Sequence, residues 1–312
     1  MQEVRNIRQT DVVRAVSRMQ DYIEMHISEP ITLHQLAGTA GYSQWHSERI
    51  FKELTGKSPF DYIRALRLTK AALVLRDGKA RVTDVAFDFV FDSHEGFTKA
   101  FSRQFGLPPR RYSQETPVIP FFLPNRVIEA SVPRNKENDR NMSTPANTVF
   151  VQVIERPARK IMLKRGRKAC DYYEYCSEAG CDASDRIWGV LSSVKEAMYE
   201  PIGMWLPEHM ISEGTSKYVQ GVELPLEYSK PVPEGYEMIE VPACKMMVFQ
   251  GQPYDDEHYE DAISDIWDIM KIYDPKIYGY DWADEEAPRF QLAPMGYRGY
   301  IEARPVRAIN PA

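Results

Sequence analysis

A tryptophan, a histidine and an arginine stand together near the start of a predicted helix over residues 43–54. Trp45, His46 and Arg49 occupy positions i, i+1 and i+4, so Trp45 and Arg49 share one side of that helix. An arginine can donate two hydrogen bonds to the edge of a guanine, and a tryptophan can pack on a thymine methyl group. This spacing predicts contacts with nucleic-acid bases. The neighbouring polar candidates for the same surface are Ser43, Gln44 and Lys52.

A second predicted helix, residues 93–105, carries a weaker set of polar side chains. Its candidate residues are Ser93, His94, Glu95, Lys99 and Arg103. Lys99 and Arg103 suit phosphate oxygens. Glu95 would repel phosphate unless it accepts a hydrogen bond from a cytosine amine. We therefore expect this helix to position the protein on a duplex more than to specify the sequence.

The two helices belong to one unit that occurs twice in the first 115 residues. Ala37 matches Ala86 at an offset of 49, and a run of later positions matches at an offset of 50. The positions matching at 50 are Phe51, Gly56, Pro59 and Tyr62. Such a repeat fixes the architecture, here an all-α domain with two tandem helix-turn-helix motifs.

Local signals indicate where these helices begin and which side is buried. Thr32 with Gln35 has the spacing of a capping box, and Ser43 suits the N-cap of the helix that follows. In the second copy, Thr83 and either Asp92 or Ser93 are expected to cap the two helices. The core side of the first copy is predicted to contain Leu36, Ala37, Ile50, Phe51 and Leu54.

A helix of about 18 residues, predicted from Pro59 to about Arg76, joins the two copies. At 1.5 Å per residue it is about 27 Å long, close to the roughly 34 Å of one turn of B-DNA. This length would allow one chain to place two recognition helices in successive major-groove segments. The prediction is a monomer on an asymmetric DNA site, with a dimer through the second domain left open.

Composition separates two parts of the 312-residue chain, which has a net charge of −6. Residues 1–115 hold 17 Lys and Arg against 14 Asp and Glu, whereas residues 148–312 hold 18 against 28. The basic part suits a polyanion. No apolar run is long enough for a membrane span, and four cysteines make no disulfide framework, so a cytoplasmic protein is expected. The spacing of Cys170, Cys176 and Cys181 differs from common zinc sites, and neither a metal nor a cofactor is predicted.

The last 165 residues also contain an internal repeat. Residues 155–162 match residues 240–247 at an offset of 85, and residues 222–224 match 301–303 at an offset of 79. Each half is expected to form strand, turn, strand, helix and strand. This pattern predicts an α+β domain with an antiparallel sheet and an internal pseudo-two-fold repeat. The expected division is 1–113 for DNA binding, a Pro-rich linker over 114–147, and 148–312 for the second domain.

Residues 11–113 resemble the AraC/XylS family, and residues 91–112 are close to its signature. Within that family the resemblance is to the stress-response branch that binds promoters as a monomer, in which a Trp-His pair contacts bases. Trp45 and His46 match that pair, but Glu48 stands where the branch usually has glutamine. The resemblance implies a transcription regulator whose partners are double-stranded promoter DNA and RNA polymerase.

Residues 148–306 resemble the GyrI-like effector-binding superfamily, through residues 218–223, 238–243 and 300–306. The resemblance implies an aromatic-lined groove with a glutamate at its floor that pairs with cationic, lipophilic effectors. Glu302 fits that glutamate, and Glu223 is its counterpart in the repeat. The candidate walls are Trp188, Met204, Trp205, Tyr254, Trp267, Trp282, Phe290, Tyr297 and Tyr300.

Two alternatives for the second domain stay open beside a regulator modulated by a small organic effector. In one, it hydrolyses its ligand, with Glu302 or Glu223 and a tyrosine such as Tyr254 or Tyr300 activating water. No set of nucleophile, base and orienting group is visible, so no catalytic residue is predicted. In the other, the domain docks a protein, and Glu302 merely forms an ion pair with Arg304 or Lys160.

Overall fold

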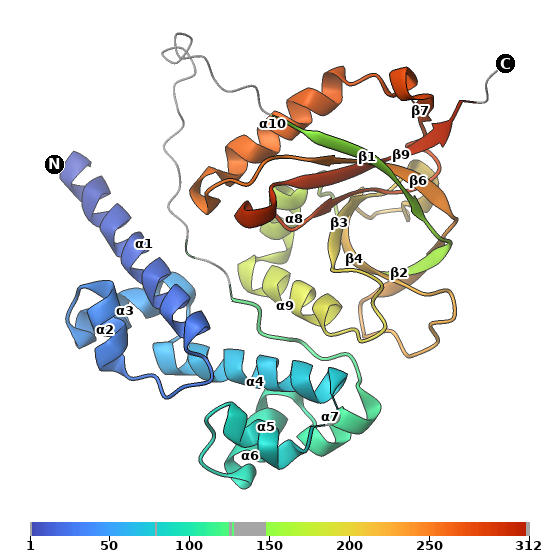
Figure 1. The fold of residues 1–312 in the computed structure, drawn as a ribbon. Helices are drawn as coiled ribbons and strands as arrows, with labels where there is room; N and C mark the ends of the chain where they lie inside the picture. Colours follow the sequence, from blue (N-terminus) through green and yellow to red (C-terminus); the bar gives the residue numbers. More distant parts are fainter. Residues whose placement is uncertain (1, 79, 125–126, 128–147, 310–312) are drawn as a thin grey trace. The chain divides into compact units, whose positions relative to one another are not determined.

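The computed structural model of the chain describes residues 2–78, 80–124, 127 and 148–309. They form two compact units, one mainly from the described residues up to 127 and the other mainly from those after 147 (Figure 1). The first unit is helical, and the second contains an antiparallel sheet flanked by helices. Most of the predicted linker over 114–147 lies outside the described residues. Among the described helices, none combines the length and apolar character needed to cross a membrane.

The described part of the first unit contains two helix pairs linked by a longer helix. Its helices are α1 (Gln2–Met25), α2 (Leu33–Ala40), α3 (Gln44–Thr55), α4 (Pro59–Asp77), α5 (Val82–Asp88), α6 (His94–Phe105) and α7 (Pro109–Glu115). A tight turn joins α2 to α3, and Gly41 in that turn has a φ of 76°, which favours glycine. The linking helix α4 has 19 residues, in agreement with the predicted length.

Side-chain caps start most of these helices where the sequence predicts them. Thr32 and Gln35 form the capping box of α2. The Ser43 hydroxyl accepts a hydrogen bond from the His46 backbone N–H at 3.3 Å, and the Ser93 hydroxyl accepts one from Gly96 at 3.0 Å. Each cap satisfies a backbone donor that has no partner inside its helix.

One predicted cap is wrong. Helix α5 begins after Arg81, which makes no side-chain capping bond, and Thr83 lies inside the helix. The Thr83 hydroxyl instead donates to the Asp84 carboxylate at 3.3 Å. Asp92 precedes the cap of α6 and does not fill the capping position, which belongs to Ser93.

Helix α4 supplies buried residues to both apolar clusters of the first unit and so joins their cores. Tyr62 and Leu66 pack in the cluster with α1, α2 and α3, while Leu68 and Leu75 pack in the cluster with α5 and α6. Leu36, Ala37, Ile50 and Phe51 are buried as predicted, but Leu54 is 41% exposed, so its assignment to the core side is wrong. Ile119 and Phe121 are buried in the second cluster, and the unit therefore extends beyond the predicted boundary at 113.

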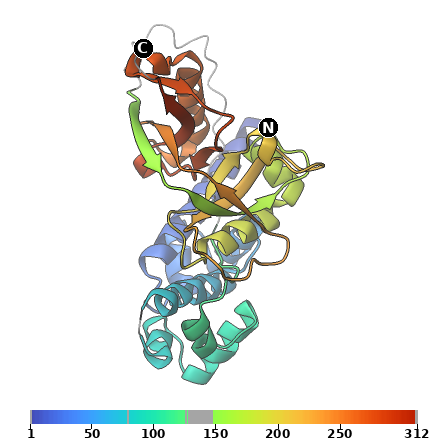
Figure 2. The same cartoon turned by 90° about the vertical axis from the view of Figure 1, so that its right-hand side faces the viewer.

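The second unit is built on a curved antiparallel sheet. Its described strands are β1 (Phe150–Arg156), β2 (Arg159–Arg165), β3 (Ile202–Trp205), β4 (Tyr218–Leu224), β5 (Glu237–Val241), β6 (Cys244–Gln250), β7 (Tyr280–Trp282), β8 (Arg289–Leu292) and β9 (Ile301–Ala308). The order along the sheet is β1-β6-β9-β8-β3-β4-β2-β5, with β7 paired to β9. Figure 2 shows this curvature from a second direction. The antiparallel sheet agrees with the predicted α+β class.

Helices cover two parts of this sheet. Helix α10 (Tyr259–Ile272) packs Ile266 and Met270 against Met247 and Phe249 of β6. Helices α8 (Tyr172–Ala179) and α9 (Cys181–Ser192) lie beside β4. The apolar residues Trp188, Leu191, Val194 and Met198 have helical spacing, but α9 ends at Ser192 and Met198 lies beyond it.

Loss of the α3 cap gives a direct test of this local structure. Replacing Ser43 with alanine leaves the His46 N–H without its acceptor, which costs about 1 kcal/mol. For a helical unit of this size, the thermal midpoint should fall by about 3–5 °C, measured by circular dichroism without DNA. Ser43→Asp, which can still cap, should stay near the wild-type midpoint. An equal loss in both variants would show that the hydroxyl does not act as a cap.

Candidate functional site

Helix α3 presents three of the predicted residues together on its exposed surface. The Trp45 side chain is 69% exposed, so it is not part of the core. The Arg49 guanidinium carbon lies 5.1 Å from the centre of the Trp45 ring, and Arg49 Nη2 lies 3.3 Å from His46 Nδ1. Ser43, Gln44 and Lys52 are exposed beside them.

The opposite side of α3 fixes this surface in place. Ile50 and Phe51 are buried, and Phe51 packs edge-to-face on Tyr62 with ring centres 5.2 Å apart. The Arg49 side chain is half exposed, and its Nε lies 3.8 Å from Glu53, an exposed pair of small energetic value. The guanidinium is therefore positioned by the Trp45 ring while its outer edge stays accessible.

Helix α6 carries the second predicted set on its solvent side. His94, Glu95, Lys99 and Arg103 are exposed, whereas Ser93 is half-buried because it caps the helix. Three phenylalanines at helical spacing, Phe97, Phe101 and Phe105, anchor the other side in the core. The helix thus offers two cations and one carboxylate to an approaching partner.

A basic groove of about 830 Å³ runs between α4 and α6. Its charged lining residues are Lys57, Asp61, Arg64, Arg67, Asp92, Lys99 and Arg103. Arg67 also stabilises the fold, because its Nε donates a hydrogen bond to the Ile27 carbonyl at 2.9 Å. Its partial burial lowers the pKa of the guanidinium. The groove brings Lys99 and Arg103 together with Lys57 and Arg64, a grouping that depends on how α4 and α6 pack.

Comparison with known proteins bears on this surface. A family model described as a helix-turn-helix domain matches residues 36–115. The multiple antibiotic resistance protein MarA of Salmonella typhimurium is 32% identical over 105 residues, which cover 34% of this chain and 82% of MarA. The chain belongs to the AraC/XylS family of DNA-binding transcription regulators.

Other relatives of this AraC/XylS-family regulator match a similar length. The transcriptional regulator Rob of the same organism is 38% identical over 117 residues, 37% of this chain, and the match spans only 40% of Rob. Among solved structures, the DNA-binding domain of AdpA in complex with a target DNA is 26% identical, with a TM-score of 0.31, covering 32% of this chain and 89% of that one.

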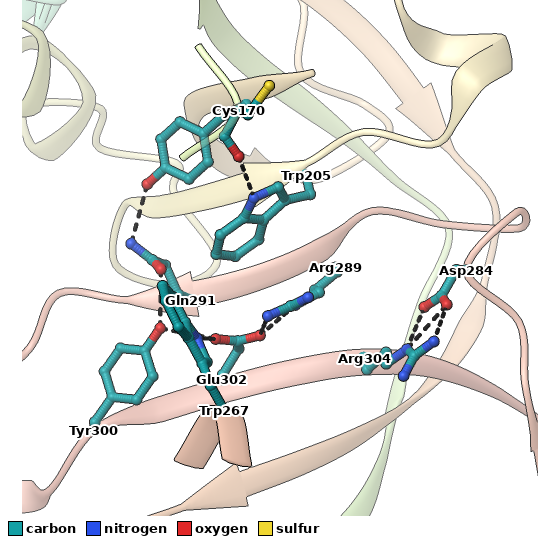
Figure 3. Close-up of polar contacts among 10 residues, drawn as sticks. Cys170, Trp205, Trp267, Asp284, Arg289, Gln291, Tyr300, Glu302 and Arg304 are labelled. Carbon is teal, nitrogen blue, oxygen red and sulfur yellow. Dashed lines mark hydrogen bonds and ion pairs between the residues drawn. The ribbon is translucent and has the colours of Figure 1, made fainter. Parts of the chain in front are cut away.

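In the second unit of this regulator, the Glu302 carboxylate on β9 is fully buried and surrounded by donors (Figure 3). One oxygen accepts from the Trp267 indole N–H at 2.8 Å and from the Tyr300 hydroxyl at 2.8 Å. The other is bound by Nε and Nη2 of Arg289 from β8. Four donors fill the accepting positions of a carboxylate.

A buried polar chain continues from Glu302 into the sheet. The Tyr300 hydroxyl lies 2.9 Å from the Gln291 side-chain amide, whose Nε2 donates to the Tyr218 hydroxyl at 3.1 Å. Burial and the neighbouring Glu302 charge raise the pKa of Tyr300 well above its usual value. Burial likewise raises the pKa of Tyr218. Both tyrosines therefore stay protonated and act as hydrogen-bonding groups.

A cavity of about 320 Å³ opens beside this cluster. Its lining residues are Cys170, Asp171, Trp205, Trp267, Met270, Lys271, Arg289 and Arg304. Trp205 and Trp267 are the two predicted wall residues that border it, and Glu302 lies behind Trp267 and Arg289 (Figure 3). Sequence reasoning missed Arg289, Lys271, Arg304 and Cys170 as parts of this wall.

The remaining predicted wall residues lie elsewhere. Met204 and Phe290 are buried in the core of the sheet, and Tyr300 is buried behind Glu302. Trp188, Tyr254, Trp282 and Tyr297 do not border the cavity either. The aromatic set predicted as one groove is therefore divided between the core, the surface and the cavity wall.

The carboxylate predicted as its counterpart, Glu223 on β4, is also buried and already paired. It accepts from Arg156 Nη1 at 2.8 Å and forms a second ion pair with Arg159 Nε. The Arg156 guanidinium stacks on the Tyr199 ring at 3.8 Å. Glu223 is therefore held inside the sheet by two arginines and has no open side for a cationic ligand.

The ion pairs predicted for Glu302 in the protein-docking alternative are wrong. Arg304 pairs with Asp284, at 2.7 Å from its Nε, and stacks on Trp282. Lys160 donates to the Tyr228 carbonyl at 3.0 Å. Within the described ranges, no cluster of His, Cys, Asp and Glu has the arrangement to hold a metal ion.

Proposed function

We propose that this regulator binds an asymmetric promoter site as a monomer, with α3 and α6 in successive major-groove segments as tandem helix-turn-helix recognition helices. The observation that carries the proposal is the exposed Trp45 ring with the Arg49 guanidinium packed against it. A large aromatic side chain in solvent, beside a guanidinium of fixed orientation, suits contacts with base edges. The candidate base contacts are Trp45, His46 and Arg49, with Ser43, Gln44 and Lys52 beside them.

The linking helix supports the spacing of the two contacts. Helix α4 has 19 residues, about 28 Å at 1.5 Å per residue, and its buried residues fasten it to both clusters. The basic groove between α4 and α6 would face the phosphates between the two contacted segments. Regulation in contact with RNA polymerase is part of the same proposal.

Removing a groove cation should weaken DNA binding uniformly. Lys99→Ala or Arg103→Ala is expected to lower affinity on all duplexes alike and to reduce the slope of log K against log salt by about 1. Fluorescence anisotropy over a salt series measures that slope. Lys276→Ala, an exposed lysine of the second unit, is the control and should leave the slope unchanged. A groove variant with the wild-type slope would show that its cation does not contact phosphate.

For the second unit we propose binding of a small organic effector in the cavity between Trp205 and Trp267. Both indoles are fixed through their N–H groups, Trp205 to the Cys170 carbonyl and Trp267 to Glu302, each at 2.8 Å. Rigid aromatic walls lower the entropic cost of holding a flat ligand. The cavity volume of about 320 Å³ fits one small molecule.

We also propose that the two halves of this unit are copies of one module that runs strand, turn, strand, helix and strand. The strand order, which is unchanged when β1, β6, β9 and β8 are exchanged with β5, β2, β4 and β3, supports this proposal. The pairing register corrects the expected match of the two glutamates, because Gln220 lies opposite Lys164 on β2 as Glu302 lies opposite Phe249 on β6, so the counterpart of Glu302 in this register is Gln220 and not Glu223. The geometry does not favour the hydrolase alternative, because Glu302 already accepts from four donor groups and Glu223 is buried between two arginines, so neither carboxylate is open to a water molecule.

A further inference from the structure

The cavity of the second unit holds a charge arrangement that bears on the class of its ligand. We propose that the effector is a flat organic anion, such as an aromatic carboxylate, bound by the outer edge of Arg289 between Trp205 and Trp267. This inference rests on the proposed effector function and specifies the ligand class.

An internal cation already occupies the position that a cationic ligand would need. The Arg289 guanidinium carbon lies 4.5 Å from the centre of the Trp205 ring, and the same group is paired with the buried Glu302 (Figure 3). A ligand cation would have to displace Arg289 and leave it without its carboxylate. Breaking a buried ion pair in this way is strongly unfavourable.

The polar groups left to a ligand are donors. Both indole N–H groups are already used, and Glu302 has no accepting position left. The Arg289 side chain is one-third exposed, and among the described residues its Nη1 forms no hydrogen bond. A guanidinium edge with open N–H groups matches a carboxylate, which accepts two parallel hydrogen bonds.

The other charged residues that line the cavity also favour a negatively charged ligand. Lys271 pairs with Asp268 at 3.0 Å, but both side chains are exposed, so this pair is weak and a ligand anion at the rim can compete for the ammonium. Arg304 is engaged with Asp284. Asp171 is the acidic residue of the described cavity lining, and its carboxylate caps α8 by accepting from the Glu174 N–H at 2.9 Å. Its charge is thus directed toward a helix N-terminus.

Calorimetry on the full chain with three probes that share one ring system tests the proposal. 2-Naphthoate is expected to bind about ten-fold or more tightly than the neutral 2-naphthamide, since one charge-assisted pair is worth roughly that factor. 2-Naphthylmethylammonium should bind no better than the amide. R289M alone would leave Glu302 buried without a cation, so the variant used is the double change R289M with E302Q.

The double variant should lose the preference for naphthoate over naphthamide, and K271M should reduce it by about two- to three-fold. R307M removes a guanidinium that pairs with Glu285 and Glu286 outside the cavity, and it should bind naphthoate as the wild type does. Equal binding of the three probes would overturn the anion class while leaving a ligand cavity in place. Tighter binding of the ammonium, or unchanged naphthoate preference in the double variant, would also overturn it. Absence of binding by all three would overturn both the anion class and the effector cavity.

Discussion

Replacement of Arg49 with alanine is expected to remove about 1–3 kcal/mol of discrimination between a preferred DNA sequence and unrelated duplexes. The guanidinium is held against Trp45 at the exposed N-terminal half of α3, where helix-turn-helix proteins contact base edges. Affinity for unrelated duplexes should fall much less, because phosphate contacts from other cations remain. Anisotropy titrations on a selected duplex and a scrambled one measure both quantities.

The conservative change Arg49→Lys separates base contact from charge. A lysine keeps the positive charge but cannot give the paired hydrogen bonds of a guanidinium. It should therefore keep the affinity for scrambled DNA and lose most of the discrimination. If Arg49→Ala weakens binding equally on both duplexes while Arg49→Lys restores it, Arg49 contacts phosphate and the proposed base contact is wrong.

Replacement of Glu223 with glutamine is expected to lower the free energy of unfolding of the second unit by about 3–5 kcal/mol. The change keeps the side-chain size but leaves the guanidiniums of Arg156 and Arg159 buried without their carboxylate. Urea unfolding followed by tryptophan fluorescence suits this measurement. Four of the five tryptophans, all except Trp45, lie in the second unit, so the signal reports mainly on it.

Glu155→Gln is the matched control for that experiment. Glu155 pairs with Lys245 at 3.3 Å, and both side chains are exposed, so its loss should cost at most about 1 kcal/mol. Similar losses in the two variants would mean that the buried Glu223 pairs contribute no more than a surface ion pair.

The helical unit was largely predictable because its signals are local. A cap needs only a hydroxyl and the helix that follows, so Thr32, Ser43 and Ser93 could be identified without tertiary structure. The same reasoning failed at Thr83, where the helix begins one residue earlier and no side chain caps it. Leu54 was assigned to the core from its spacing, yet it lies at the end of α3 where the unit no longer covers it.

The site of the second unit could be predicted only in part because it depends on strand register. Glu302 and Trp267 were identified from the sequence, but the partner of Glu302 comes from a neighbouring strand. Gln291 lies opposite Glu302 in the β8–β9 pairing, which places Arg289 on the same face two residues away. One signal in the sequence was Arg289 itself, a charged residue next to Phe290 in a short apolar strand, which indicated a partner for a buried carboxylate. The cavity wall also needs Cys170 and Lys271, which only the packing of the helices brings near β8.

Binding of two recognition helices from one chain is tested most directly by hydroxyl-radical footprinting of the full chain on a duplex that the protein itself selects from a random pool. Two protected segments are expected on one face of the duplex, about one helical turn apart, with no two-fold symmetry in the selected sequence. Protection of a palindrome by a dimer would contradict two recognition helices acting from one chain. Protection of a single segment that is unchanged when Lys99 and Arg103 are replaced with alanine would contradict it as well.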